Sequence, residues 1–180
     1  MSLSHALLIA LIENPGSGLE LSDRFDRSIG MYWHAPHQQI YRNLAQLEAA
    51  GWVASTPVES SRGRKKEYRV LAAGRKELRR WVREAREPEP YRSELMIRMR
   101  AEATLGPCGL DTEIERRLLV HQARLASYID FEKRRFREPT SSRSTAIMHL
   151  ILKKGMMNES TWIDWLRQAL HVLRQNVRPT

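Results

Sequence analysis

Apolar side chains recur every three or four residues at the start of the chain, and this spacing predicts amphipathic helices. The stripe of a first helix consists of Leu3, Ala6, Leu7, Ala10 and Leu11. The run Asn14-Pro15-Gly16 ends this helix, because proline and glycine favour turns. Ser17 is then placed to cap a second, short helix. The buried stripe of that helix is expected at Leu21, Phe25 and Ile29.

A third helix is predicted over residues 36–50, since Pro36 suits a first helical turn and Gly51 a C-terminal stop. Its apolar face is formed by Ile40, Leu44 and Leu47. At about 100° per residue, the opposite face is expected to hold Ala35, Gln38, Arg42 and Ala45, flanked by Gln39, Tyr41 and Gln46. This outward face is polar but carries few formal charges.

The next stretch changes to the pattern of β-strands. Residues that favour strands stand on both sides of the basic segment 60–66, with Trp52, Val53 and Val58 before it and Tyr68 and Val70 after it. This pattern predicts a two-stranded β-hairpin with a basic tip. Three helices followed by such a hairpin form a winged helix-turn-helix, whose third helix enters a DNA groove while the wing lies along the backbone. We therefore expect a mainly α fold with a small β-hairpin.

The segment Glu87-Pro88-Glu89-Pro90 follows an arginine-rich helix predicted over 72–86 and divides the chain, because helices seldom continue through paired prolines. We expect a winged-helix domain at 1–87 and a helical domain at 91–180. Helices are predicted there over 93–105, over 111–137 and in the last segment. Their apolar stripes include Ile114, Leu118, Leu125, Tyr128, Trp162, Trp165, Leu166, Ala169, Leu170 and Leu173. Three helices with so little surrounding chain are expected to pack against a second copy, as a C-terminal helical dimerisation domain.

Charge and composition narrow the function. The 30 basic and 21 acidic residues give a net charge of +9, which favours an anionic partner, with nucleic acid ahead of an acidic membrane surface. The single cysteine, Cys108, excludes an internal disulfide and favours the reducing cytoplasm. No apolar run reaches the ~18 residues that a membrane span needs. His34 and His37 lack further ligands for a metal, and neither a cofactor motif nor a catalytic motif is present, so no cofactor and no enzyme are expected.

Two groups of residues are the candidates for contact with DNA. On the third helix, Gln38, Gln39 and Arg42 are expected to meet base edges, since arginine pairs with guanine and glutamine with adenine. Tyr41 offers either a phosphate-binding hydroxyl or a partly buried ring. In the wing, phosphates are the expected partners of Arg62, Arg64, Lys65 and Lys66. The alternatives are a solvated helix face and a solvated loop. Trp33, Trp81, Trp162 and Trp165 either pack or line a pocket for a flat aromatic ligand.

Four segments in the first half of the chain form a specific combination. They are Leu3-Ser4-His5-Ala6-Leu7-Leu8, His37-Gln38-Gln39-Ile40-Tyr41, Leu44-x-x-Leu47-Glu48-x-x-Gly51-Trp52-Val53 and Lys66-x-Tyr68-Arg69-Val70-x-x-x-Gly74. Together they resemble the PadR family of bacterial transcriptional regulators. The ending Trp162-Ile163-Asp164-Trp165-Leu166 is similar to the last helix of the larger subgroup of that family, which has an AphA-like helical C-terminal domain.

The resemblance implies a dimer, and it implies DNA contacts at Tyr41, Arg42, Arg64, Lys65 and Lys66. Members of the family are mostly repressors, and several release DNA when they bind a small aromatic molecule. The sequence favours a cytoplasmic homodimer that binds double-stranded DNA at an inverted repeat. The resemblance implies a repressor that a small aromatic effector releases, while control by a redox change, or no such control, stays open. The alternative is a non-specific winged-helix protein that binds nucleic acid in an architectural role.

Overall fold

The computed structural model describes residues 2–27, 35–58, 65–88, 90, 92–137 and 142–175, and the chain divides into two compact units, Met1–Pro88 and Glu89–Thr180. The division falls one residue after the first boundary expected from the proline-rich segment. Among these residues, no helix combines the length and apolar character that a membrane span requires.

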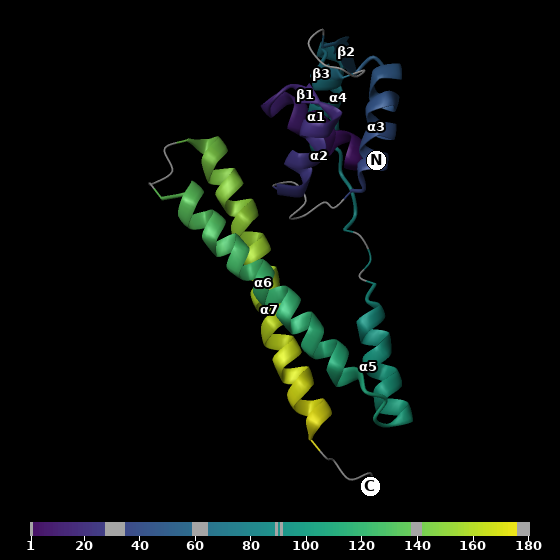
Figure 1. Cartoon of the computed structure of the whole chain (residues 1–180), viewed down its shortest axis with the longest axis vertical. Coiled ribbons are helices and arrows are strands. Elements are labelled where there is room, and N and C mark those ends of the chain that lie inside the picture. Colours follow the sequence, from purple (N-terminus) through teal and green to yellow (C-terminus); the bar gives the residue numbers. More distant parts are fainter. Residues whose placement is uncertain are drawn as a thin grey trace. The chain divides into compact units, whose positions relative to one another are not determined.

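Within its described residues, the first unit contains four helices, namely α1 (Ser2–Glu13), α2 (Gly18–Arg27), α3 (His37–Ala49) and α4 (Ala72–Arg83) (Figure 1). The stripes predicted for the first three helices meet in one core that includes Leu7, Leu8, Leu11, Leu21, Phe25, Ile40, Leu44 and Leu47. The predicted stripe position Ile29 lies outside the described residues. The core holds the opposite face of α3 toward solvent, because Ile40, Leu44 and Leu47 are its buried residues.

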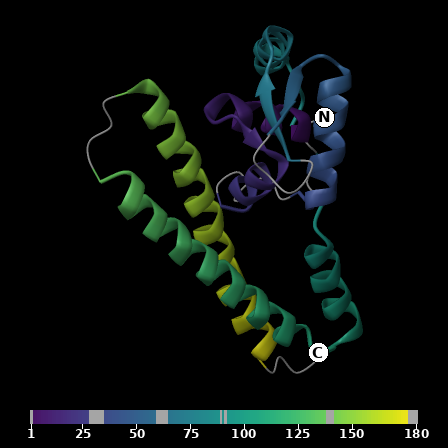
Figure 2. The same cartoon turned by 45° about the horizontal axis from the view of Figure 1, so that its top comes forward.

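Three short strands complete this unit, namely β1 (Gly16–Ser17), β2 (Val53–Pro57) and β3 (Lys66–Val70). The predicted hairpin is confirmed, since β2 and β3 are antiparallel with Val53 opposite Val70 and Pro57 opposite Lys66. Figure 2 shows the two strands of the hairpin side by side, with α3 next to them. The tip, residues 59–64, lies outside the described residues. Strand β1 pairs with the other edge of β3, giving the order β1-β3-β2.

The structure corrects three local expectations. Ala35 was expected on the outward face of the third helix, but α3 begins at His37, so the helical periodicity does not apply to Ala35, which is 3% exposed and belongs to the core. The arginine-rich helix ends at Arg83, three residues earlier than predicted. The sheet has three strands rather than two, because the turn residues Gly16 and Ser17 pair with β3. The predicted stop of α3 is confirmed, since Gly51 follows its end with φ +67°.

The second unit contains the three predicted helices, α5 (Glu94–Leu105), α6 (Leu110–Arg135) and α7 (Arg143–Arg174). Helices α6 and α7 pack side by side (Figure 1). Buried residues from all three helices form a small core, namely Leu95, Ile114, Leu166 and Ala169. Trp162 and Trp165 pack against this core.

Two histidine–glutamate pairs join α6 to α7. His121 Nδ1 lies 2.5 Å from Glu159 Oε2, and His149 Nε2 lies 2.5 Å from Glu132 Oε1. The His121 ring also stacks on Trp162, with ring centroids 5.4 Å apart. Because these pairs lie at separate places along the two helices, they fix the alignment of α6 against α7.

Candidate nucleic-acid interface

The outer surface of α3 carries the four residues that the sequence analysis singled out on this helix. Gln38, Gln39, Tyr41 and Arg42 are all exposed, whereas Ile40 between them is fully buried. The structure therefore brings these polar side chains together on the first two turns of one exposed helix. A surface of this size and polarity fits the major groove of B-DNA, which admits an α-helix.

Arg42 is exposed on this surface. Within the part of the chain that the structure describes, no carboxylate lies within ion-pair distance of it. The side chain of the neighbouring Asn43 forms hydrogen bonds within the protein. Its amide N–H donates to the Gln39 carbonyl at 2.9 Å, and its Oδ1 accepts from the Ser4 hydroxyl at 2.9 Å. The bond from Ser4 ties the middle of α3 to α1, so Arg42 stands on a fixed helix, and no carboxylate of the described residues pairs with it.

Tyr41 is held by the start of α2. Its ring lies against Gly18 so closely that a Cβ on Gly18 would come 2.3 Å from Tyr41 Cε1. Tyr41 nevertheless remains 47% exposed. The structure thus confirms a partly buried ring, and the phosphate-binding hydroxyl stays a prediction.

The start of α2 is fixed by a capping box. The Ser17 N–H donates to Glu20 Oε2 at 2.8 Å, and the Glu20 N–H donates to Ser17 Oγ at 3.3 Å. The predicted cap at Ser17 is thereby confirmed. The Ser17 N–H, and after it the Lys65 ammonium, lower the pKa of the Glu20 carboxyl to about 2.

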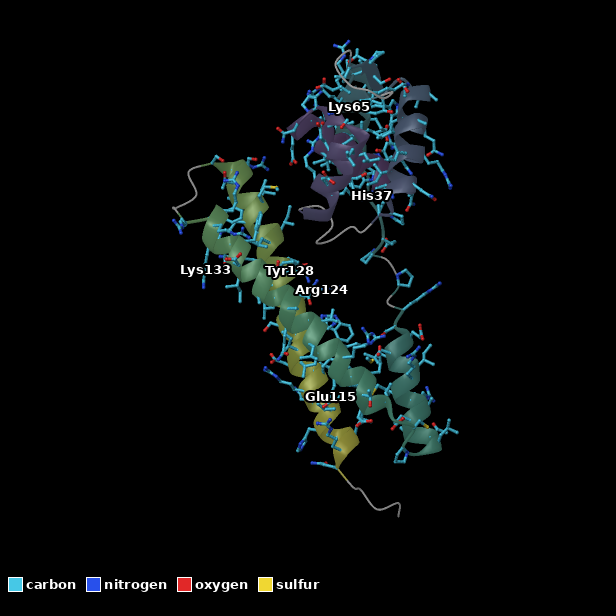
Figure 3. The ribbon with its side chains drawn as sticks, viewed as in Figure 1. His37, Lys65, Glu115, Arg124, Tyr128 and Lys133 are labelled. Atoms are coloured by element: carbon cyan, nitrogen blue, oxygen red, sulfur yellow. The ribbon has the colours of Figure 1, made fainter. Side chains whose placement is uncertain are left out.

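The base of the wing carries two lysines that are paired with carboxylates. Lys65 Nζ lies 3.0 Å from Glu20 Oε1, and Lys66 Nζ lies 3.8 Å from Glu48 Oε2. Figure 3 labels Lys65 on the first unit, well apart from His37 at the start of α3. The remaining wing candidates, Arg62 and Arg64, lie outside the described residues.

Glu48, near the end of α3, is held in place by strand β2. The Ser55 hydroxyl donates to Glu48 Oε1 at 2.5 Å. This bond and the Lys66 charge lower the pKa of the Glu48 carboxyl. Sequence reasoning singled out neither Glu20 nor Glu48 as part of the surface. The Ser17-x-x-Glu20 spacing is a signal that could have located the first of them.

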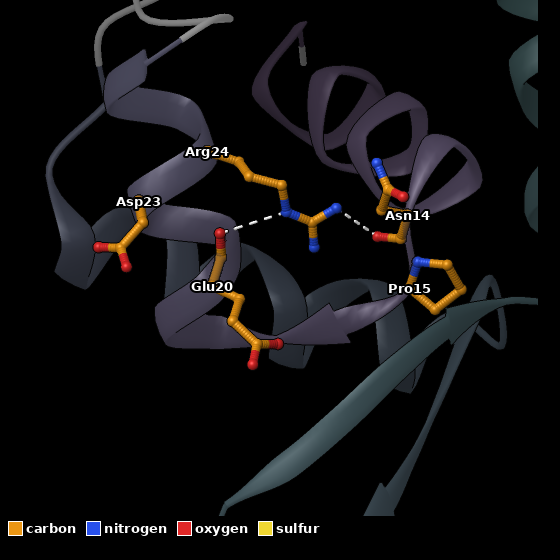
Figure 4. A pocket seen from close by; sticks show the side chains of 5 residues that line it. All are labelled: Asn14, Pro15, Glu20, Asp23 and Arg24. Atoms are coloured by element: carbon orange, nitrogen blue, oxygen red, sulfur yellow. Dashed lines mark hydrogen bonds between the residues drawn. The ribbon is translucent and has the colours of Figure 1, made fainter.

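A hollow of about 310 Å³ beside α2 is lined by Asn14, Pro15, Glu20, Asp23 and Arg24 (Figure 4). The Arg24 guanidinium crosses it and donates to the backbone carbonyls of Asn14 at 2.5 Å and Glu20 at 3.2 Å. Arg24 therefore links the end of α1 to α2, and we assign the hollow to this contact between the two helices.

The tryptophans that the structure describes are engaged in packing. Trp81 on α4 stacks on His5 with ring centroids 4.4 Å apart, and Trp162 meets Trp165 edge to face at 5.7 Å. Trp33 and His34 lie outside the described residues. In the described ranges, no group of three or more histidine, cysteine or acidic residues is arranged to hold a metal ion.

Comparison with known proteins agrees with this arrangement. Residues 7–80 match the PadR-like family of transcriptional regulators, and residues 91–174 match the virulence activator alpha C-terminal family. The chain is 35% identical to the probable transcriptional regulator Rv1176c of Mycobacterium tuberculosis, over 97% of this chain and 99% of that protein. The chain belongs to the PadR-like family. This family consists of transcriptional regulators and not of enzymes.

A second relative of this PadR-like chain is the negative transcriptional regulator PadR of Bacillus subtilis, with 28% identity over 95% of this chain and 97% of that protein. The crystal structure of PadR with operator DNA has a TM-score of 0.79 and 24% identity, covering 96% of this chain and 99% of that chain. The structure of PadR with p-coumaric acid has a TM-score of 0.74 and 25% identity, covering 97% and 100%.

The virulence activator AphA of Vibrio cholerae has a TM-score of 0.77 and 23% identity, covering 95% of this chain and 97% of that chain. These likenesses extend over both units of the PadR-like chain. The predicted fold, a winged helix followed by a helical C-terminal domain, is thereby confirmed.

Proposed function

We propose that this chain is a sequence-specific regulator that binds double-stranded DNA as a homodimer in the cytoplasm and represses transcription. The observation that carries the proposal is the exposed surface of α3, where Arg42 lacks a carboxylate partner among the described residues and stands beside Gln38 and Tyr41. The complex of the relative PadR with operator DNA supports the same role for this chain.

In this proposal α3 enters the major groove and the wing follows the backbone. Arg42 reads guanine through two hydrogen bonds, and Gln38 and Gln39 pair with adenine. Tyr41, Lys65 and Lys66, together with Arg62 and Arg64, bind phosphates. Phosphate contacts supply most of the affinity, whereas the α3 contacts supply the preference for a sequence.

The apolar surface of the second unit supports a homodimer. Large apolar side chains remain exposed on α6 and α7, among them Leu119 at 67%, Leu150 at 68% and Met157 at 65%. Several large apolar side chains exposed on two neighbouring helices favour a protein interface, and a second copy is the partner that we propose for them. A two-fold dimer places two α3 helices on an inverted repeat, with half-sites about 10 bp apart or a small multiple of that spacing.

A small aromatic acid is the effector that the relatives suggest. PadR of Bacillus subtilis binds p-coumaric acid. For the present chain we propose release from DNA by a ligand of this chemical class, through a shift between a dimer geometry that matches the operator spacing and one that does not.

A gel-shift titration tests this function. The purified chain is titrated onto the duplex upstream of its own gene, with excess unrelated duplex and a series of salt concentrations. A discrete complex that survives the competitor is the expected result. A complex that the competitor removes would instead support the non-specific architectural role, and no complex at low salt would refute DNA binding.

A further inference from the structure

The two described lysines of the wing base are exposed, and each forms an ion pair with a carboxylate. Lys65 is paired with Glu20 at 3.0 Å, and Lys66 with Glu48 at 3.8 Å. Arg42 on the adjoining surface has no such partner among the described residues. The cations assigned to phosphate binding are thus partly neutralised within the protein, while the cation assigned to base reading is not.

Both carboxylates are held in place by bonds that do not involve the lysines. Glu20 accepts the Ser17 N–H in the capping box of α2, and Glu48 accepts the Ser55 hydroxyl of β2. These bonds lower the pKa of both carboxyls, that of Glu20 to about 2, so both are ionised at neutral pH. Each carboxylate therefore keeps its position even when the side chain of its lysine moves away.

A phosphate that approaches either lysine meets this fixed negative charge. Binding then replaces one ion pair by another, and the phosphate is repelled by the carboxylate that remains nearby. The net gain from wing contacts is consequently smaller than the number of lysines indicates. Contacts made by α3 are not reduced in this way.

We infer that Glu20 and Glu48 limit the affinity of the wing for the phosphates of any duplex, so that tight binding also needs the base contacts of α3. The inference rests on the proposed function. Unrelated duplex relies on phosphate contacts for essentially all of its affinity, whereas an operator adds base contacts. An element that weakens phosphate contacts therefore lowers binding to both but leaves a usable affinity only for the operator.

The variants Glu20→Gln and Glu48→Gln test the inference. Glutamine removes the negative charge, yet its amide oxygen still accepts from the Ser17 N–H or the Ser55 hydroxyl. Affinity is measured by fluorescence anisotropy on two duplexes of equal length, the region upstream of the gene and a scrambled sequence, over a range of salt concentrations.

Glu84→Gln is the matched control. It changes the net charge of the same unit by the same amount and breaks a similar pair, since Glu84 Oε1 lies 3.0 Å from Arg86 Nη2 on the segment that follows α4. A general effect of net charge appears equally in this control. Urea unfolding of each variant checks that the fold is retained.

The expected result is a rise of about 3-fold to 10-fold in affinity for the scrambled duplex, with a similar fold-change for the upstream region. The salt slope on the scrambled duplex steepens by up to about one unit for each variant, as a fuller phosphate contact requires. In a Lys65→Gln background, the Glu20→Gln change loses most of its effect, because Glu20 acts through Lys65.

An unchanged affinity for the scrambled duplex, or an equal rise with Glu84→Gln, would overturn the inference. A rise confined to the upstream region would also overturn it, because phosphate contacts are common to both duplexes. Failure of the unmodified chain to bind either duplex would overturn the proposed function as well, and it is recognised before any variant is compared.

Discussion

Gly18 and Tyr41 are in direct contact across α2 and α3, and the absence of a side chain at Gly18 is what admits the tyrosine ring. A Cβ on Gly18 would lie 2.3 Å from Tyr41 Cε1 and 3.0 Å from both Cδ1 and Cζ. The contact joins the first turn of α2 to the exposed surface of α3. It sets the position of Tyr41 within that surface.

Gly18→Ala should lower the free energy of unfolding by about 1–2 kcal/mol, because the added methyl group overpacks the contact and the tyrosine ring must turn outward. Urea unfolding measures the change. Gly18→Ala combined with Tyr41→Ala should recover most of the loss that alanine causes at Gly18 alone, since the ring is then gone. Additive effects of the two changes would show that the ring does not limit this position.

Arg42→Ala and Lys65→Ala should affect DNA binding differently. Loss of Arg42 should weaken binding to the operator relative to unrelated duplex by ~1–3 kcal/mol, because a base contact is removed. Loss of Lys65 should weaken binding to both duplexes and reduce the salt slope by about 1 at most. Anisotropy titrations on both duplexes make the comparison. If the two variants behaved alike on all DNA, Arg42 would not be a base reader.

Leu150→Glu together with Ile147→Glu should convert the proposed dimer to a monomer. The two residues are 68% and 44% exposed on α7, so the change should disturb an interface between copies rather than the core of one copy. Sedimentation velocity measures the mass. Affinity for the operator should fall at least about 10-fold, because two linked α3 helices bind more tightly than one.

Leu19→Glu serves as the control for this pair, since Leu19 is a 59% exposed leucine in the first unit. It should leave the mass unchanged. A dimer that persists with both substitutions on α7 would show that the interface lies elsewhere.

Glu77 should make the stability of the first unit depend on acid pH. Arg80, and after it His5, hold the pKa of this carboxyl at about 2, below the ordinary value of 4.5. A carboxyl with a lowered pKa stabilises the fold fully above pH 4.5 and loses this contribution as the pH falls toward 2. Glu77→Gln should therefore be less stable than the unmodified chain at pH 7, and the difference should narrow below pH 4.5. Urea unfolding at several pH values tests this, and a difference that is constant with pH would contradict it.

The helices could be predicted from the sequence because their signals are local. Apolar spacing located the buried residues Leu21, Phe25, Ile40 and Leu44, and the turn residues located most helix ends. Strand β1 could not be predicted, because two residues carry no strand pattern and their pairing with Tyr68 and Glu67 depends on the fold. Ala35 was misplaced because the periodicity was extended past the true start of α3.

The candidate surface was predicted only in part, because some of its contacts depend on the packed fold and not on local spacing. Helical spacing was sufficient to place Gln38 and Arg42 on the exposed side of α3. The pairing of Lys65 with Glu20 joins residues that are 45 positions apart in the sequence, so no local sequence pattern predicts it. The contact between Gly18 and Tyr41 likewise requires α2 and α3 to be packed first.

Selection from a pool of random-sequence duplexes is the direct test of sequence recognition by α3, because the pool contains every short half-site and the chain itself selects among them. We expect the unmodified chain to enrich one inverted repeat, with half-sites about 10 bp apart or a small multiple of that spacing. Arg42→Ala should lose the preference at one position of each half-site. A pool that stays without a consensus after repeated rounds, although the chain retains duplex, would contradict sequence-specific recognition by α3.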